Sequence, residues 1–356
     1  MPIPNKDIST WRSCGSSSSL IPSPAILSPA IPTSPITDLV IASRGSRLAL
    51  RQAEIVAAAI ERVHPDLATS ISVIKTQGDV DQRPFTEIGG KGLFTSEVER
   101  AVALGEAHIA VHSAKDLTGE LHPDCSIICV PERAPRADVI VGGTGASGEE
   151  RLGGLQPGAV VGTSSLRRRA LLAEARPDLE VREFRGNLDT RLAKVENGEV
   201  DAAVLAAAGI DRLGVWSAEE ISSASLGADW WVPAPGQGVL AIEGLTENRA
   251  VIALLAHFED PHTRAELECE RAFAARMEGG CSIPLGCSAQ VSGHSLLATG
   301  FLGLPDGSRS MRDRISGPLS AAAAMGRELA QAIIEGGGDE ILEELGDIGP
   351  GGAPWA

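Results

Sequence analysis

The sequence contains no tyrosine, and aromatic residues make up only 3% of its 356 residues. Surfaces that bind single-stranded nucleic acid stack bases on aromatic rings, so this scarcity argues against such a surface. Positive charge is also in deficit, with 31 Lys and Arg against 47 Asp and Glu and a formal net charge of −16. An acidic chain has no general attraction for nucleic acid or for anionic membranes. The composition therefore predicts neither of these partners.

Long apolar runs and a disulfide framework are missing as well. No apolar stretch approaches the roughly 20 residues that a membrane helix needs. The six cysteines, at positions 14, 125, 129, 269, 281 and 287, lack the paired short spacing of zinc sites. No secretory signal precedes them, so we expect reduced, mostly buried thiols and no metal. These features predict a cytoplasmic protein, and the acidic surface is compatible with the monomer that we expect.

The first 37 residues hold 7 Pro and 9 Ser and show neither helical nor strand periodicity. Such a composition predicts a disordered tail. A plastid transit segment is the alternative, because the stretch is rich in serine and poor in acids, although it has one arginine and much proline. A short flexible end is expected at residues 347–356.

Between these ends, apolar strand patterns alternate with helical ones. DLVIAS, ISVIKT and HIAVHSAK predict strands of a first lobe, with helices in SRLALRQAEIVAAAIERV and GLFTSEVERAVALG. A second lobe follows the same scheme, with strands in AVVGTSS, VREFRG and DAAVLA. This alternation predicts two α/β lobes with largely parallel sheets. We expect the first at 38–135 plus about 234–252, and the second at 136–233.

The region 253–346 has a different pattern and predicts a small α+β domain. Helical periodicity over 247–277 is followed by strands around 288–304 and 308–316. The PDGS turn between these strands predicts a hairpin. A last helix is expected over roughly 318–334.

Two stretches share one arrangement, an apolar strand, a Ser/Thr/Gly turn and an arginine-bearing helix: VIASRGSRLAL (40–50) and VVGTSSLRRRAL (160–171). A helix start offers free backbone N–H groups and the positive end of a dipole, so it attracts anions. The side chains that could add to this are Ser46, Thr163, Ser165, Arg44, Arg167 and Arg168. Helix capping alone would explain one such stretch, but two on separate lobes favour a ligand cleft.

Further charged residues follow other strands. Arg185 and Arg191 lie in FRGNLDTRL, and Arg212 lies in IDRLG. In HSAKD, Lys115 and Asp116 come directly after an apolar strand, where α/β proteins bind ligands. A single carboxylate facing arginines can stabilise a cation or act as a general acid or base. Solvent-exposed ion pairs are the alternative, and we expect them for Arg169, Arg176 and Arg182.

Two glycine-rich stretches complete the candidates. GGKGLF (89–94) lacks the P-loop order, so it is weak evidence for phosphate binding. In EGGCSIPLGC, two glycines precede Cys281, which predicts an accessible loop thiol suited to covalent attachment. A buried structural thiol is the usual alternative.

In chain order, SRGSRLALRQA, GGKGLF, HSAKD, GTSSLRRR, FRGNLDTRL, AAAGIDRLG, PGQG and EGGCSIPLG resemble the motifs of the porphobilinogen deaminase family. The resemblance extends from about residue 38 to the C-terminal helix. It implies two lobes like those of periplasmic binding proteins and a third domain with a cofactor cysteine. Cys281 would then hold a dipyrromethane through a thioether. Four porphobilinogen units would be deaminated and added to it, and water would release hydroxymethylbilane.

The resemblance also implies roles for individual residues. Asp116 matches the catalytic carboxylate of the family. The cofactor-binding positions would be Cys281, Ser46, Lys115, Thr163, Ser165, Arg167, Arg168 and Arg185. The substrate-binding positions would be Arg44, Arg191 and Arg212. Ser96 stands where lysine is common, and Thr118 stands near a place where proline is common.

Two other functions compete with this one. A non-catalytic, two-lobed anion-binding protein would have the same lobes but no need for EGGCSIPLG or a third domain. A nucleotide-dependent enzyme would use GGKGLF instead.

Overall fold

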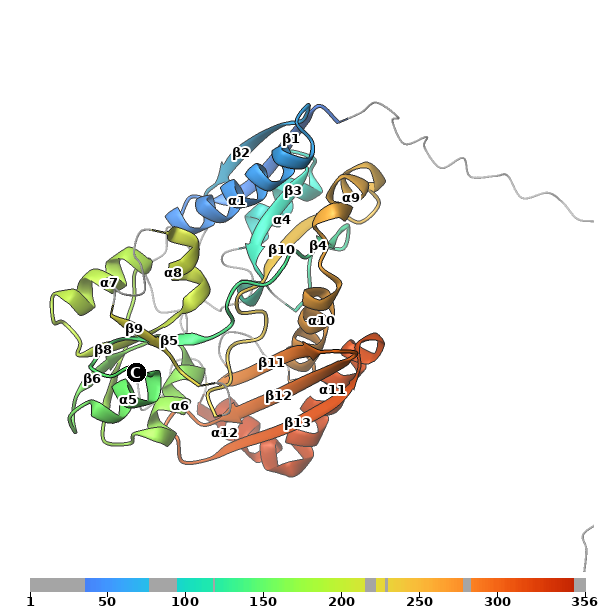
Figure 1. The fold of residues 1–356 in the computed structure, drawn as a ribbon. Helices are drawn as coiled ribbons and strands as arrows, with labels where there is room; N and C mark the ends of the chain where they lie inside the picture. Colours follow the sequence, from blue (N-terminus) through green and yellow to red (C-terminus); the bar gives the residue numbers. More distant parts are fainter. Residues whose placement is uncertain are drawn as a thin grey trace, which may run out of the picture. The chain divides into compact units, whose positions relative to one another are not determined.

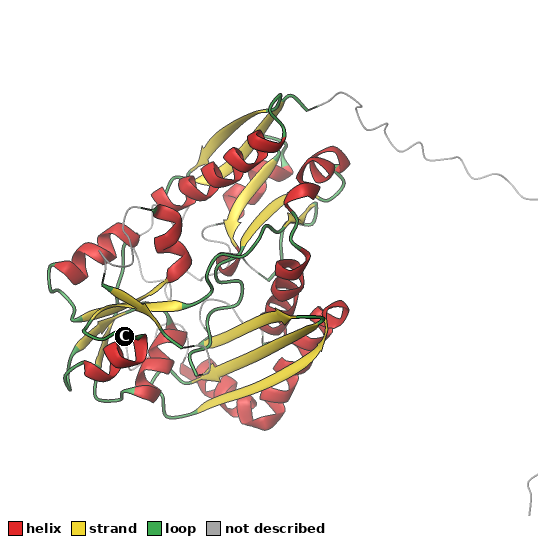
Figure 2. Cartoon of the chain, in the orientation of Figure 1, coloured by secondary structure: helices red, strands yellow, loops and turns green. Residues whose placement is uncertain are grey.

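The computed structural model describes residues 36–76, 95–117, 119–214, 222–227, 230–277 and 283–348 (Figure 1). Strands gather in three sheets, and helices lie between and beside them (Figure 2). The predictions for residues 1–35, GGKGLF, Thr118, Cys281 and residues 349–356 concern positions outside the described residues, whereas residues 347 and 348, expected in the flexible end, belong to the last helix. In the part of the chain that the structure covers, every helix is too short or too polar to span a membrane.

The first sheet has the strand order β2-β1-β3-β10-β4. Its members are β1 (Asp38–Arg44), β2 (Ala68–Ile74), β3 (Ile109–Ser113), β10 (Leu240–Leu245) and β4 (Cys125–Cys129). β1 is parallel to β2 and β3, while β10 runs antiparallel to β3 and β4. The sheet is therefore largely parallel, as predicted, and a distant segment of chain inserts into it.

Helices cover both faces of this sheet because its central strands are apolar on both sides. Leu39 and Ile41 of β1 pack with α1 (Arg47–Val63), whose Ile60 is buried. The alternate β1 residue Ala42 packs on the other face with Val98 of α4 (Ser96–Ala103). Successive strand residues point to opposite faces, so one short strand serves both cores.

The second sheet has the order β7-β6-β8-β5-β9. Its strands are β7 (Glu180–Arg182), β6 (Val160–Gly162), β8 (Ala202–Ala206), β5 (Asp138–Gly142) and β9 (Ser223–Ser225). Helices α5 (Gly148–Gly154) and α6 (Leu166–Ala175) contribute to one core, and α7 (Leu188–Glu196) and α8 (Ala207–Leu213) to another. β5 is the antiparallel strand here, so it has the place that β10 has in the first sheet.

The third sheet is antiparallel, with β11 (Leu285–Ser292), β12 (Ser295–Gly303) and β13 (Ser310–Pro318) in that order. The predicted hairpin at PDGS is confirmed, since β12 pairs with β13. The stretch expected as one strand over 288–304 is two strands, because the chain turns at Gly293 (φ 61°). The helices of this region are α9 (Arg249–Leu255), α10 (Pro261–Arg276), α11 (Ala322–Ile333) and α12 (Asp339–Ile348).

One buried carboxylate joins this third region to the segments that connect the two α/β sheets. Glu270 of α10 is fully buried and accepts hydrogen bonds from both terminal nitrogens of Arg133, at 2.8 and 3.0 Å. It also accepts the backbone N–H of Gly236 at 2.6 Å and that of Ala289 at 2.8 Å. Arg133 lies in the chain that leaves the first sheet, and Gly236 in the chain that returns. All four bonds satisfy a charge that burial would otherwise make costly.

The close contact between α10 and α11 predicts that a larger side chain at Gly326 destabilises the protein. A Cβ at Gly326 would collide with the carbonyl oxygen of Cys269, so Gly326→Ala should lower the free energy of unfolding by about 1–3 kcal/mol. The matched control is Gly153→Ala in α5, where a Cβ would meet no atom within 4 Å. That change should be neutral or stabilise by up to about 1 kcal/mol. Urea unfolding measures both, and equal effects would contradict this packing.

Candidate active site

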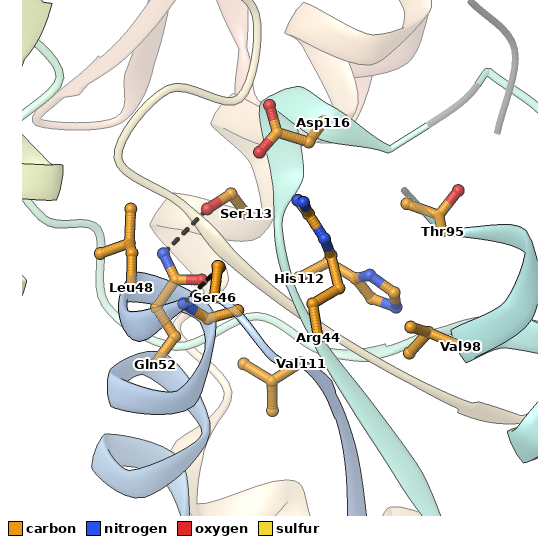
Figure 3. Close-up of a pocket in the computed structure, with 11 residues that line it drawn as sticks. Arg44, Ser46, Leu48, Gln52, Thr95, Val98, Val111, His112, Ser113 and Asp116 are labelled. Atoms are coloured by element: carbon orange, nitrogen blue, oxygen red, sulfur yellow. Dashed lines mark hydrogen bonds between the residues drawn. The ribbon is translucent and has the colours of Figure 1, made fainter. Parts of the chain in front are cut away.

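Two parallel strands bring Arg44 and Asp116 to one edge of the first sheet. Arg44 ends β1, and Asp116 follows β3 by one short 3-10 turn, Ala114–Asp116. Because β1 and β3 are parallel neighbours, their carboxyl ends meet at the same edge. Both residues line one pocket, together with Ser46, Thr95 and His112. Figure 3 shows the Arg44 side chain extending in the direction of Asp116.

The start of α1 forms another wall of this pocket. Ser46 is the N-cap of α1, and its hydroxyl accepts the backbone N–H of Ala49 at 3.3 Å. The predicted cap is thereby confirmed, and the hydroxyl proton is still able to reach a ligand. Further along α1, Gln52 donates from Nε2 to the Ser113 hydroxyl at 2.8 Å (Figure 3). This bond ties α1 to β3 just before Asp116.

The turn that carries Lys115 and Asp116 is held by the returning chain. Ala114 donates its backbone N–H to the carbonyl of Val239 at 3.0 Å. Gly236 lies against the same turn with φ of +71°, and a Cβ there would lie 3.0 Å from the backbone nitrogen of Lys115. Only glycine combines this backbone conformation with so close an approach. The PGQG motif therefore supports the Asp116 turn from behind.

Acidic groups lie buried behind the pocket. His112 and Glu243 form a hydrogen bond of 2.9 Å between Nε2 and Oε2. Burial raises the pKa of Glu99, and the neighbouring charge of Glu243 adds to this rise. Burial and Glu243 likewise raise the pKa of the Cys125 thiol to about 12. This thiol is therefore protonated and unreactive at neutral pH.

The second candidate turn, between β6 and α6, is also a capped helix start. Ser165 is the N-cap of α6 and accepts the backbone N–H of Arg168 at 3.4 Å. The Thr163 hydroxyl accepts the backbone N–H of Ser165 at 3.2 Å. Ser164 bonds both the N–H and the carbonyl of Phe184, at 3.1 and 2.8 Å, which fastens the turn to the chain after β7. Capping and anion attraction thus coexist at this turn.

Arg167 and Arg168, in the first turn of α6, are both buried against Asp138. Arg167 Nη1 lies 2.8 Å from Asp138 Oδ2, and Arg168 Nη2 lies 2.6 Å from Oδ1. These two guanidiniums hold the pKa of Asp138 far below its usual range, against the effect of burial. Sequence reasoning missed Asp138. Its only signal there was an acid at the first position of the apolar strand DVIVG.

Burial shifts the pKa values of two further cations around Asp116. The pKa of Lys115 is lowered, chiefly by burial, with Asp116 acting in the opposite direction. The pKa of Arg191 falls to about 10, chiefly by burial and then by the charge of Arg168, while Asp116 again opposes the change. These mutual effects connect cations of α6 and α7 with the Lys115–Asp116 turn. The group has more positive than negative charges.

The other predicted arginines have partners of their own. Arg212 donates from Nη2 to the carbonyl of Gly238 at 2.6 Å, and burial lowers its pKa to about 10. Arg185 pairs with Glu183 at 2.6 Å. The ion pairs expected for Arg176 and Arg182 are present, with Asp178 and Glu180 as their partners.

These residues fit a ligand with several carboxylates. The Nε atoms of Arg167 and Arg191 are buried and lack a hydrogen-bond partner among the described residues. Leaving such a donor unsatisfied costs about 1–3 kcal/mol, which a bound carboxylate would recover. The excess of guanidinium groups also suits a polyanion. Described residues include no group of His, Cys, Asp and Glu arranged to hold a metal ion.

Comparison with known proteins agrees with this chemistry. The family model described as "Porphobilinogen deaminase, dipyromethane cofactor binding domain" matches residues 39–253, and "Porphobilinogen deaminase, C-terminal domain" matches residues 265–335. The strands of both α/β sheets fall within the first match, apart from residue 38, and the antiparallel sheet falls within the second. The predicted fold class, two α/β lobes and a small C-terminal α+β domain, is confirmed by the three sheets and by these two matches.

Two relatives are similar over nearly their whole length. Porphobilinogen deaminase of Roseiflexus castenholzii is 43% identical over 305 residues, covering 85% of this chain and 98% of that protein. Porphobilinogen deaminase of Geobacter sulfurreducens is 40% identical over 306 residues, covering 86% and 94%. Among solved structures, the Bordetella pertussis BvgS periplasmic VFT2 domain matches 62% of this chain and 85% of its own, with 16% identity and a TM-score of 0.35. Likeness at that level adds nothing to the assignment.

The buried acids behind the pocket give a test of its electrostatics. The folded-state pKa of Glu99 is raised, so ionisation of Glu99 costs stability as pH rises above its ordinary value of 4.5. Glu99→Gln should therefore raise the free energy of unfolding at neutral pH. Below 4.5 the wild-type side chain is neutral in both states, and the difference should shrink.

Urea unfolding at several pH values measures this difference. The control is Glu106→Gln, which changes an exposed carboxylate of the same lobe. If Glu99→Gln behaves like this control, or destabilises the protein at neutral pH, burial does not raise the pKa of Glu99.

Proposed function

The chain belongs to the porphobilinogen deaminase family, and on that premise we propose how its site works. It is a transferase that deaminates porphobilinogen and joins four units head to tail on a covalently bound dipyrromethane, then releases hydroxymethylbilane by hydrolysis. The observation that supports this mechanism most directly is the placement of Asp116. One carboxylate lies at a strand edge within the electrostatic range of several desolvated cations.

The charges of the substrate match this site. Porphobilinogen carries an acetate and a propionate, so every added unit brings two carboxylates. Arginines whose pKa has fallen only to about 10 remain charged at neutral pH. Arg44, Arg191 and Arg212 are proposed to bind the substrate carboxylates. Bidentate guanidinium contacts would orient the aminomethyl group relative to Asp116.

Asp116 is proposed as the catalytic group. Loss of ammonia from porphobilinogen leaves a positively charged azafulvene, and a carboxylate beside it stabilises that charge. The same carboxylate can accept the proton that the pyrrole α-carbon releases after carbon–carbon bond formation. The turn before Asp116, held by Val239 and Gly236, would keep its carboxylate in place.

The cofactor supplies, when bound, the nucleophilic pyrrole carbon that begins the chain. Cys281 is proposed to hold it through a thioether, although this position lies outside the described residues. Its carboxylates are proposed to contact Ser46, Lys115, Thr163, Ser165, Arg167, Arg168 and Arg185. The buried, unpaired Nε of Arg167 supports this assignment.

We further propose that the domains have the limits expected from the sequence pattern, 38–135 with about 234–252, 136–233 and 253–346, and that the chain acts as a monomer. The membership of β10 in the first sheet and of β5 to β9 in the second supports the first two limits.

Covalent attachment at Cys281 is directly measurable by intact mass. The full chain from a host that makes porphobilinogen should carry an adduct near the mass of two pyrrole units. Cys281→Ala should lack it, and Cys125→Ala should retain it, because the Cys125 thiol is buried and has a pKa of about 12. An unmodified wild-type chain would instead indicate a two-lobed anion-binding protein without catalysis.

The role of Asp116 predicts that its loss lowers turnover without preventing attachment of the cofactor. Asp116→Asn should fold and carry the adduct, but its kcat should fall by about 10²- to 10⁴-fold, the usual contribution of a positioned acid–base group. Asp124→Asn, at an exposed carboxylate before β4, is the matched control and should keep its activity. Near-normal turnover of Asp116→Asn would remove Asp116 from its proposed role.

A further inference from the structure

The carboxylate of Asp138 is the most fully hydrogen-bonded charge near the site, yet the catalytic mechanism does not use it. Asp138 begins β5 and is fully buried. Oδ1 accepts hydrogen bonds from Nε and Nη2 of Arg168, at 3.1 and 2.6 Å, and from Gln237 Nε2 at 2.9 Å. Oδ2 accepts one from Trp231 Nε1 at 2.7 Å and pairs with Arg167 Nη1 at 2.8 Å.

The donors to this carboxylate come from two distant segments. Arg167 and Arg168 belong to the first turn of α6, while Trp231 and Gln237 belong to the chain that returns to the first sheet. Trp231 is buried, so its indole N–H cannot donate to water and needs this acceptor. Asp138 therefore fixes the position of the two arginines relative to the returning chain.

The two arginines use their guanidinium groups differently. Arg168 engages all three nitrogens, because Nε and Nη2 bond Asp138 and Nη1 bonds the carbonyl of Val204 at 2.9 Å. Arg167 makes both of its contacts within the described residues through Nη1, to Asp138 and to the carbonyl of Val232 at 2.8 Å. Its Nε is buried without a partner there. Among the described residues, nothing bonds the Nε–Nη2 edge of Arg167, and this edge suits bidentate binding of a carboxylate.

We propose that Asp138 is a positioning residue: it holds Arg167 by Nη1 and so presents the Nε–Nη2 edge to a carboxylate of the cofactor or of the growing chain. Asp138 itself contacts no ligand. This inference rests on the proposed function, because that function supplies the carboxylates. Without Asp138, two adjacent buried guanidiniums would lack their shared counter-charge and repel each other.

The test compares variants for their rate of cofactor loading. Each full-length chain is made in a host without porphobilinogen and then mixed with porphobilinogen, and intact mass follows adduct formation with time. Asp138→Asn, which is nearly isosteric, should load about 10- to 100-fold more slowly, the effect of misplacing a binding group. Thermal unfolding of the same samples reports the folded fraction.

Trp231→Phe keeps the test decisive if Asp138→Asn does not fold. It removes one hydrogen bond to Asp138 and keeps an aromatic ring in the core. We expect cofactor loading to slow about 3- to 10-fold, with kcat of the loaded enzyme changed less than about twofold, because binding of the cofactor carboxylates is weakened while Asp116 is untouched. The matched control is Trp230→Phe: its ring packs edge-on against Trp231, with the two ring centroids 5.2 Å apart, and it is not among the described hydrogen-bond donors to Asp138. It should load and turn over as wild type.

The results distinguish a failure of the role of Asp138 from a failure of the proposed function. If wild type forms the adduct and folded Trp231→Phe matches it in loading rate, the role of Asp138 is wrong and the proposed function stands. The same holds if Trp231→Phe lowers only the unfolding temperature, because that would show a purely structural role. If wild type forms no adduct and shows no turnover, the proposed function fails, and the inference about Asp138 fails with it.

Discussion

A charge that is buried in a protein has to be paired, and two carboxylates that obey this constraint hold the molecule together. Glu270 joins the chain leaving the first sheet, the chain returning to it and the start of the third sheet through four hydrogen bonds. Asp138 joins the start of α6 to the same returning chain. Removing one partner from such a group costs far more than an exposed ion pair would. Side chains outside the pocket thus decide where the segments of the candidate site lie.

The same constraint explains how an acidic chain can hold a site for a polyanion. Arg191 and Arg212 are desolvated enough to lower their pKa values to about 10, and Lys115 is shifted in the same direction. The two arginines still remain charged at neutral pH, so their environment favours an incoming carboxylate. The overall charge of −16 is then no obstacle. Surface acids more than a Debye length away interact weakly with these partly buried cations, so the local charge decides what binds.

Much of the fold was predictable because local patterns agreed with it. The apolar run within residues 38–44 and the helical period after Ser46 predicted the strand, cap and helix that the structure contains. The hairpin at PDGS followed from its turn residues. The stretch 288–304 was less clear, because an apolar run does not reveal where it turns, and Gly293 divides it. That β10 lies between β3 and β4 depends on pairing across more than a hundred residues, which no local pattern reports.

By itself, the sequence determined which residues could carry the chemistry: a carboxylate after a strand, arginines at helix starts and a thiol after two glycines. It also determined the family, because the motifs occur in one order along the chain. Only the tertiary structure decided which groups meet. It placed Arg44 and Asp116 at one sheet edge and buried Arg167 and Arg168 against Asp138. The physical reason is that burial and pairing of charge depend on segments far apart in sequence, whereas capping, turns and periodicity depend on neighbours.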